Sequence, residues 1–437
     1  FTIKNKSVNM HNILIFPGGT ENGLEIYRSL QYAKNVNLYS VSSDVPNHAK
    51  FVYQNHFIIP DIYNEDCLTR LNEIIDQNDI KLIFPANSLV IDFLVENRDN
   101  INAKIFLTDN DIVRTVRSKK KTYLLFKEII PTPKILNVSS IDEYPVFIKP
   151  DKLYGSQGAR IIYSPNVLNS IELDLSDYVI TEYLPGKEFT VDCFSTKKNG
   201  VLFASARERV RIRMGTSMRS ARADHHIQKY SRKIAERIFS KLNIDGLWFF
   251  QLKYSKNNEL KLLEIEPRVA GTMGYSRALG VNLPLIYLHY MKGKQIKIPK
   301  IASHSIILDR ALQNRYITNL KYNTVYIDLD DTIIIKGKIN LEIISYLYQC
   351  INNNIKIVLI TKSLENDLYS FLAKMRIKDI FNKIICLNED DSKSNYIKEA
   401  DAIFIDDSFS QREEVNNKLG IAVFDPSMID VLLKKCI

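Results

Sequence analysis

The sequence predicts a multidomain chain that combines α/β and α+β architecture. Its 437 residues are too many for one hydrophobic core, and about two to four domains are expected. Strand and helix signals alternate between about residues 12 and 108, as in a parallel sheet covered by helices. Two later strand signals flank a short polar turn, which indicates an antiparallel hairpin. A further apolar strand at 324–327 begins a separate α/β pattern.

Composition and charge favour a globular protein that binds small acidic molecules. Hydrophobic residues make up 45% of the chain and charged residues 25%, which excludes an intrinsically disordered chain. The net charge of +9 is scattered, and no basic tract is interleaved with aromatic residues, so nucleic acid is not an expected partner. Nucleotides and other acidic metabolites are the expected partners instead.

The cysteines predict a reducing compartment. There are 5, far apart and without a C-x-x-C pair, which argues against a disulfide framework or a zinc site. No apolar run is long enough to span a bilayer, and the first residues lack the apolar core of a signal peptide. We therefore expect a cytoplasmic protein without membrane insertion, and the oligomeric state, a homo-oligomer included, is left open.

The first segment has the pattern of a parallel α/β domain. Its strand signals lie at 13–16, 36–41, 81–85 and 104–107, and an amphipathic helix is predicted over 24–32. The turn 18–23 is similar to a dinucleotide-binding loop, but it is not G-x-G-x-x-G, and the acidic residue expected about twenty positions later is unconvincing. A tight turn or an acceptor-binding loop is therefore favoured over a nicotinamide site.

A strand lysine and a glycine-rich loop predict a phosphate site. Ser118 opens a predicted helix, and the later strand 145–150 carries Lys149 near its end. The loop 154–160 contains two glycines and a serine. Glycine lets backbone N–H groups approach an anion closely, and a lysine on the preceding strand can reach the same phosphates.

The antiparallel hairpin predicts a metal site. If the two central residues of the polar segment 255–259 form the turn, Gln251 lies opposite Glu264. Glu266 then shares a face with Glu264, because strand side chains alternate with a period of two. Such oxygen ligands suit Mg²⁺, and Arg268 can grip a phosphate oxygen. The alternative is a solvated strand edge whose glutamates pair with nearby basic residues.

Residues 178–192 add a third set of candidate nucleotide contacts. The segment 182–184 leaves a strand and can hydrogen-bond an adenine edge through its backbone, while Glu188 can accept both ribose hydroxyls. In their order and separations, Lys149, the 154–160 loop, this hinge and the hairpin group resemble the ATP-grasp superfamily. The similarity is greatest to the carbamoyl-phosphate-synthase-like branch, which includes amino-acid ligases.

The resemblance covers about residues 12 to 295 and implies a role for each motif. The implied ATP contacts are Lys149, one of Lys119 or Lys120, Gly155, Ser156 and Gly158, Glu182, Tyr183 and Leu184 at the adenine, and Glu188 at the ribose. The implied ligands of Mg²⁺, with Mn²⁺ as an alternative ion, are Gln251, Glu264 and Glu266. Glu266 stands where many members have asparagine, and Ser118 where members often have aspartate.

A basic segment, 207–215, is the candidate acceptor site. In the family the equivalent strand and loop lie over the acceptor carboxylate, which makes Arg207 and Arg211 candidates to orient it or to stabilise an acyl phosphate. The resemblance implies that Arg268 neutralises phosphate charge with Lys149. The alternative for the basic segment is a solvated charged strand.

The last part of the chain carries its own acidic motif. The strand 324–327 delivers Asp328 and Asp330 to a turn at its carboxyl end, and a later strand ends in Thr361. A helix is predicted over 394–399, directly after Lys393, and another strand ends in Asp406 and Asp407. Because ligands bind beyond the carboxyl ends of parallel strands, we expect these side chains to cluster.

These elements resemble the haloacid dehalogenase (HAD) superfamily over residues 322 to 437. The resemblance implies that Asp328 is the nucleophile, that Asp330 is the general acid/base and that Thr361 and Lys393 hold the phosphate, with Lys398 as the rival of Lys393. The implied Mg²⁺ ligands are Asp328, Asp330 and Asp406, the last helped by Asp407. The intervals between motifs leave no room for a large cap, and a decayed, structural domain is the alternative.

The sequence thus predicts a pre-ATP-grasp α/β domain, an ATP-grasp domain and a Rossmann-like HAD domain. The predicted bounds are 1–110, 111–310 with its ATP-binding subdomain at about 112–185, a linker at 311–321, and 322–437.

The predicted function is a Mg-ATP-dependent carboxylate–amine ligase fused to a phosphohydrolase, with a small-molecule carboxylate, an amine or amino acid and a phosphorylated metabolite as partners. Two alternatives are a small-molecule kinase paired with a phosphatase, and a ligase with a non-catalytic HAD domain. A nucleic-acid end-processing protein would need G-x-x-x-x-G-K-[ST] and a basic channel, and the sequence shows neither.

Overall fold

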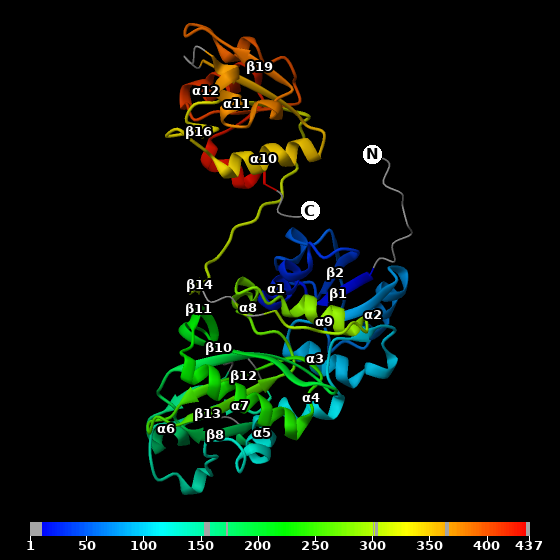
Figure 1. Cartoon of the computed structure of the whole chain (residues 1–437), viewed down its shortest axis with the longest axis vertical. Helices are drawn as coiled ribbons and strands as arrows, with labels where there is room; N and C mark the ends of the chain where they lie inside the picture. Colours follow the sequence, from blue (N-terminus) through cyan, green and yellow to red (C-terminus); the bar gives the residue numbers. More distant parts are fainter. Residues whose placement is uncertain are drawn as a thin grey trace. The chain divides into compact units, whose positions relative to one another are not determined.

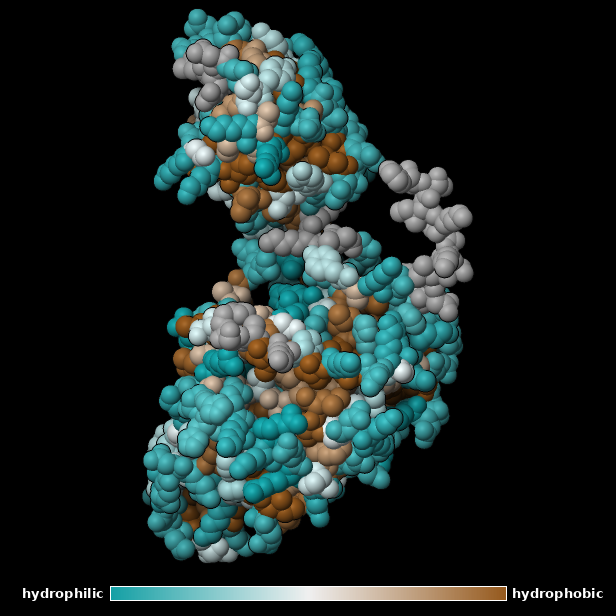
Figure 2. All heavy atoms as spheres, viewed as in Figure 1, coloured by the Kyte–Doolittle hydropathy of each residue, from teal (hydrophilic) through white to brown (hydrophobic). Residues whose placement is uncertain are grey.

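The structure is a computed structural model that describes residues 11–152, 158–171, 174–299, 301, 305–362 and 367–433. The chain divides into two compact units, Phe1–Leu312 and Gln313–Ile437, which are called unit 1 and unit 2 below (Figure 1). The face seen in Figure 2 is largely hydrophilic, because most apolar side chains of the strands and helices lie in the cores of the units.

Unit 1 begins with a five-stranded parallel sheet, and the predicted parallel α/β pattern is confirmed. Its strands, in the order β3-β2-β1-β4-β5, are β3 (Asn55–Ile58), β2 (Val36–Ser42), β1 (His11–Phe16), β4 (Ile80–Pro85) and β5 (Lys104–Ile105). The accompanying helices are α1 (Glu21–Leu30), α2 (Asp66–Gln77) and α3 (Ser88–Glu96). The strand order reverses between β1 and β4, so the loops after these two strands border the crevice where ligands of such sheets bind.

Two further sheets complete unit 1. The smaller has the order β7-β6-β8, formed by β7 (Arg160–Ile162), β6 (Val146–Pro150) and β8 (Tyr178–Glu182). The larger is antiparallel, in the order β13-β12-β9-β10-β11-β14, formed by β13 (Leu260–Glu266), β12 (Gly246–Tyr254), β9 (Glu188–Thr196), β10 (Gly200–Arg213), β11 (Thr216–Arg222) and β14 (Ile307–Asp309). Its helices include α4 (Asn110–Val116), α5 (Lys119–Phe126), α6 (Pro165–Asn169), α7 (His225–Leu242), α8 (Gly274–Ala278) and α9 (Leu283–Met291).

The long helix α7 holds the larger sheet in place through one apolar face. Asp224 caps its first turn by accepting a hydrogen bond from the backbone of Ile227. The buried residues Ile227, Ile234 and Ile238 of α7 belong to the same core as Trp248, which is fully buried on β12. This packing fixes the strands that carry the candidate metal ligands.

The hairpin between β12 and β13 has the predicted register at the site but a different turn. Gln251 pairs with Glu264, as predicted. The turn is longer than two residues, however, because Ser255 N bonds Glu259 O and Tyr254 pairs with Leu260. A register shift between residues 251 and 252 compensates for the longer turn.

Unit 2 is built on a second five-stranded parallel sheet. Its order is β19-β18-β15-β20-β21, with β19 (Lys383–Cys386), β18 (Lys356–Thr361), β15 (Thr324–Ile327), β20 (Ala402–Ile405) and β21 (Ala422–Phe424). The other elements include α10 (Leu341–Asn352), α11 (Leu368–Lys374), α12 (Phe409–Leu419) and a small hairpin of β16 (Ile334–Ile335) and β17 (Lys338–Ile339).

One expected helix of unit 2 is shorter than the sequence suggested. A helix over 394–399 was indicated, but the structure has a single 3₁₀ turn, Lys393–Asn395. Ser392 and Ser394 are both hydrogen-bonded to Glu414 of α12, so tertiary contacts override the local helix preference.

No helix within the described ranges is both long and apolar enough to cross a bilayer.

Gly246 tests the packing of unit 1. Its φ is +96°, and an added Cβ would lie 2.3 Å from Cζ of the buried Tyr287 on α9. Gly246→Ala is expected to lower the unfolding free energy of unit 1 by about 2 to 4 kcal/mol, from backbone strain plus overpacking. Trp248 is the only tryptophan of the chain, so its fluorescence during chemical denaturation reports unit 1 selectively.

Gly293 is the matched control for this variant. It also has a positive φ, +72°, but an added Cβ would meet nothing within 4 Å. Gly293→Ala should therefore cost only about 1 kcal/mol, and equal losses for the two variants would contradict the packing argument.

Candidate active sites

A first cavity of unit 1, about 520 Å³ in volume, lies between the small sheet and the large antiparallel sheet. Most of the predicted nucleotide contacts line it: Lys119, Lys149, Glu182, Tyr183, Leu184 and Glu188. Gly158 is next to a lining residue, Ala159, whereas Gly155 and Ser156 lie outside the described residues. Pro133, Phe147 and Ile161 add apolar walls, as a base-binding pocket requires.

Among the cations that line this cavity, Lys149 has the pKa that is shifted most from its ordinary value. Its side chain comes from β6, only 8% of the residue is exposed, and its Nζ donates to Tyr123 Oη over 2.6 Å. Tyr123 in turn donates to the carbonyl oxygen of Leu263, also over 2.6 Å. Burial lowers the pKa of Lys149 to about 7, and the nearby charge of Lys119 acts in the same direction. Bound phosphates would oppose both effects.

Of the two candidate helix lysines, Lys119 faces the cavity. Its Nζ lies 3.2 Å from the carbonyl oxygen of Asp151, and burial lowers the pKa of this lysine. Lys120 is exposed, and its backbone N–H donates to the carboxylate of Asp151. Of the two lysines, Lys119 is therefore the one in the lining of the cavity.

The two predicted glutamates at the nucleotide end have different partners. Glu182 accepts hydrogen bonds from the backbone N–H of Lys134 over 2.7 Å and from Lys261 Nζ over 2.6 Å. Glu188 is paired with Arg209 and with Lys253. The carboxylate of Glu182 is thus used within the protein, so an adenine would meet the hinge chiefly through its backbone.

A second cavity, about 600 Å³ in volume, adjoins the first. The loops after β1 and β4, at the reversal point of the parallel sheet, contribute Thr20, Asn22 and Asn87. Four residues line both cavities, namely Arg209, Gly215, Gln251 and Glu264. The two cavities therefore meet beside the pair Gln251–Glu264.

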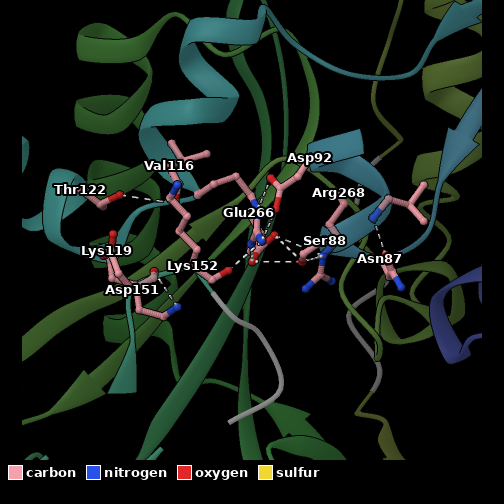
Figure 3. Close-up of polar contacts among 12 residues, drawn as sticks. Asn87, Ser88, Asp92, Val116, Lys119, Thr122, Asp151, Lys152, Glu266 and Arg268 are labelled. Atoms are coloured by element: carbon pink, nitrogen blue, oxygen red, sulfur yellow. Dashed lines mark hydrogen bonds and ion pairs between the residues drawn. The ribbon is translucent and has the colours of Figure 1, made fainter. Parts of the chain in front are cut away.

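The donor set at this junction fits a magnesium ion. Gln251 and Glu264 face each other across the β12–β13 ladder and offer oxygen ligands, which leaves room for phosphate oxygens and water. Glu266, the third predicted ligand, lines neither cavity. Its carboxylate is bonded instead to Ser88, Arg117 and Arg268, and Figure 3 shows it beside Ser88, Asp92 and Arg268. Burial alone would raise the pKa of Glu266, but the arginines lower it.

The basic strand β10 places a different arginine at the junction from those predicted. Arg207 is buried and bonded to Asp192 and Thr272, and it lines neither cavity. Arg211 has a side chain that is 50% exposed and pairs with Asp309 over 2.7 Å. Arg209 lines both cavities with a side chain only 7% exposed.

Sequence reasoning missed Arg209 although it belongs to the same period-two series. Its Nη1 lies 3.2 Å from Gln251 Oε1, and its Nε has no hydrogen-bond partner among the described residues. A register shift between Arg209 and Arg211 interrupts the ladder, so alternation alone does not place Arg211. A buried cation with an unused donor beside the metal pair suits a phosphate or an acyl phosphate.

Arg268, predicted as a phosphate contact, lies in the wall of the second cavity. Its Nε donates to Ser88 Oγ over 3.0 Å, and its guanidinium sits 5.1 Å from the ring centroid of Phe249. The residues 271–272 of the loop after β13 line the same cavity. The lining of the second cavity thus includes three arginines, Arg209, Arg268 and Arg310, against two glutamates, Glu21 and Glu264.

In unit 2 the predicted acidic residues meet at the carboxyl ends of three adjacent strands. Asp328 follows β15 and Asp406 follows β20, while Thr361 ends β18 and is buried. Lys393 Nζ lies 2.5 Å from Asp328 Oδ1 and 2.6 Å from Asp406 Oδ2. Lys398 Nζ donates to the carbonyl oxygen of Asn395, so the geometry favours Lys393 over its rival.

The carboxylates of unit 2 fit a divalent cation. One oxygen from each of Asp328, Asp406 and Asp407 lies within 4.8 Å of the others. Burial raises the pKa of Asp328 to about 7, with Asp406 and Asp330 adding to the rise and Lys393 opposing it. Asp330 is exposed, and its backbone bridges to Ile334 at the small hairpin.

Comparisons with known proteins find a matching family model and similar solved structures for unit 1. A family model described as "ATP-grasp in the biosynthetic pathway with Ter operon" matches residues 174–310. Biotin carboxylase of Campylobacter jejuni, solved as a β-γ-ATP complex, superposes with a TM-score of 0.58 at 14% identity, covering 69% of this chain and 76% of that one. N5-carboxyaminoimidazole synthetase of Staphylococcus aureus with ADP gives 0.56 at 14% identity, over 70% and 84%.

Unit 1 therefore has a fold similar to those of these solved structures, and its residues 174–310 match an ATP-grasp family model. Two curated relatives carry the same similarity at the sequence level. The arginine-specific carbamoyl phosphate synthase large chain of Oryza sativa subsp. japonica is 25% identical over 279 residues, 56% of this chain and 23% of that one. The 3-methyl-D-ornithine–L-lysine ligase of Methanosarcina barkeri is 30% identical over 141 residues, 32% of this chain and 36% of that one. The chain thus spans about a quarter to a third of the relatives' length.

The pKa of Lys149 gives a proton-linked binding prediction for the first cavity. With a pKa of about 7, Lys149 is mostly neutral at pH 8 in the free protein. Bound phosphates favour the charged amine, so ADP binding at pH 8 should take up about one proton, and the uptake should vanish toward pH 6. Calorimetry in buffers of different ionisation enthalpy measures it. Lys149→Arg, which keeps a permanent charge, is the control, and uptake by that variant would contradict the assignment.

The β10 arginines give a second prediction. If the junction of the two cavities holds the phosphate of ATP that is transferred, Arg209→Met should lower the turnover of ATP to ADP by about 100-fold, because a preorganised cation beside that phosphate is lost. Arg211→Met should stay within about 3-fold of wild type, since its ion pair is exposed. A larger effect at Arg211 than at Arg209 would restore the original assignment of the acceptor contact.

Proposed function

We propose that unit 1 is a Mg-ATP-dependent ligase that joins a carboxylate to an amine through an acyl phosphate. The meeting of two cavities at Gln251 and Glu264 carries this proposal. One cavity has the hinge, the phosphate lysines and apolar walls that a nucleotide needs. The other is cationic and lies at the crevice of the parallel sheet, where an acidic acceptor can approach the transferred phosphate.

The reaction follows from how these residues would hold the substrates. The acceptor carboxylate attacks the γ-phosphate of ATP in line, ADP leaves, and an amine then attacks the acyl carbon and releases phosphate and a proton. Lys119 and Lys149 would hold the phosphates, and Arg209 and Arg268 would hold the acceptor and the transferred group. Mg²⁺ at Gln251 and Glu264 would neutralise phosphate charge.

The relatives support a ligase over a kinase. The Methanosarcina protein is named as an amino-acid ligase, and the rice protein as a carbamoyl phosphate synthase.

The Glu21–Arg310 ion pair, at 2.7 Å, lines the second cavity with one residue of each sign. An amino acid carries both charges, so this cavity suits an amino acid as the amine.

We propose further that unit 2 is a HAD-type phosphohydrolase that acts on a phosphorylated metabolite. Asp328 would attack the phosphorus, with Asp330 protonating the leaving alcohol and then activating water. Lys393 and Thr361 would hold the phosphate, and Asp406 with Asp407 would share a divalent cation with Asp328. The interval between Thr332 and Thr361 holds a two-stranded hairpin and α10, which leaves the carboxyl ends of the sheet without a large cap domain there.

An ADP-release assay with the full chain tests the ligase proposal. The Asp328→Asn chain is used so that unit 2 does not remove a newly formed phosphate. ADP formation is expected to require both a carboxylate and an amine from the substrate pools, and to yield an amide. ADP with a stable phosphorylated product and no need for amine would establish a kinase instead.

Single substitutions then separate the two activities. Glu264→Ala should reduce ADP formation by about 100-fold or more, since the metal pair is broken, and leave hydrolysis of an aryl phosphate unchanged. Asp328→Asn should have the reverse effect. If one substitution removes both activities from a folded protein, the two sites are not independent. If wild type hydrolyses no phosphate ester, unit 2 is non-catalytic.

A further inference from the structure

Arg117 links three elements of unit 1 around Glu266. It ends α4, and its side chain is 4% exposed. Its Nε and Nη2 donate to the two carboxylate oxygens of Asp92 on α3, both over 2.9 Å. Its Nη1 donates to Glu266 Oε1 over 3.1 Å, and its Nη2 also donates to the carbonyl oxygen of Lys152 over 2.7 Å.

The next residue strengthens the same connection. Ser118 Oγ donates to Asp151 Oδ2 over 2.6 Å. Asp151 and Lys152 directly follow β6, the strand that carries Lys149. The segment 117–118 therefore ties the strand of the phosphate lysine to the strand of the metal pair, and Figure 3 shows Asp92, Asp151, Lys152 and Glu266 gathered there.

The charges of this network balance. Asp92 and Glu266 are anions, and Arg117 and Arg268 are cations that contact them. The other oxygen of Glu266, Oε2, lies 3.2 Å from Arg268 Nε and accepts a hydrogen bond from Ser88 over 3.1 Å. Because each charge is paired, Glu264 is left as the acidic residue of β13 that faces the cavities.

We propose that Arg117 is a positioning residue that balances the negative charge of Glu266 and fixes this side chain between α3 and the end of β6. The ion-paired Glu266 then supports the strand beside Glu264. This inference rests on the proposed nucleotide site. It implies that Arg117 and Glu266 depend on each other. Losing the arginine alone removes a cation from both Asp92 and Glu266 and leaves Arg268 as the remaining partner of Glu266, so one negative charge is in excess close to where the phosphates would bind, whereas losing both charges restores the balance.

A double-mutant cycle with binding as the readout tests this proposal. The variants are Arg117→Met, Glu266→Gln and the pair together, and Mg-ADP affinity is measured by calorimetry with the melting temperature of each protein. Arg117→Met is expected to weaken Mg-ADP binding by at least 30-fold. The double variant is expected to return to within 5-fold of wild type, and Glu266→Gln alone to stay within the same limit.

Arg114→Met is the matched control. Arg114 is on the same helix, but its side chain is 58% exposed and pairs only weakly with Asp111, at 3.5 Å, so its removal should leave binding unchanged. If Arg117→Met does not fold, Arg117→Lys replaces it. Lysine keeps the charge but cannot span Asp92, Glu266 and Lys152 at once, so binding should fall and Glu266→Gln should not restore it.

The outcomes are distinguishable. If wild type does not bind Mg-ADP, the nucleotide site itself is wrong. If wild type binds and Glu266→Gln loses Mg²⁺-dependent affinity, with no rescue in the pair, Glu266 is a direct metal ligand and the inference is overturned. Wild-type affinity in Arg117→Met, or in Arg117→Lys where it replaces that variant, would overturn it too.

Discussion

The pairing of buried charges is the constraint on which the two adjoining cavities of unit 1 depend. An unpaired ion loses its hydration without compensation when it is buried, so each buried charge needs an opposite partner or a ligand. Glu266 meets this demand through Arg117 and Arg268, and Asp192 meets it through Arg207. Lys149 is different, since its contact is a neutral tyrosine and burial lowers its pKa to about 7. A bound phosphate would supply the negatively charged contact that Lys149 lacks, and would favour its protonated form.

The same rule explains which arginines of β10 are structural. Arg207 is bonded to Asp192 and Thr272 within the core and lines neither cavity, although its Nη2 has no hydrogen-bond partner among the described residues, and Arg211 is half exposed beside Asp309. Arg209 is both buried and incompletely bonded within the described part of the chain, at the junction of the two cavities. Because Arg207 also has an unused buried donor, it is the place of Arg209 in the lining of both cavities, together with its unused Nε, that indicates a contact with a ligand.

Local patterns in the sequence predicted much of this fold but not its long-range charge partners. The parallel sheet follows from short apolar strands that alternate with helices, and the Gln251–Glu264 pair follows from two adjacent strands. The prediction of that pair assumed a two-residue turn, which is shorter than the turn in the structure. The pair is nevertheless present, because a register shift between residues 251 and 252 offsets the longer turn. Arg117 could not be assigned, because its partner Glu266 is 149 positions away and only the folded chain brings them together.

Lys393 shows how chemistry and folding can demand the same residue. It lies between Asp328 and Asp406, which end two neighbouring strands of the unit 2 sheet. Without a cation between them, these carboxylates would repel each other and push the strand ends apart. A substitution at this position would therefore reduce the amount of folded protein as well as the rate of any reaction, and selection on the residue would act on both properties together.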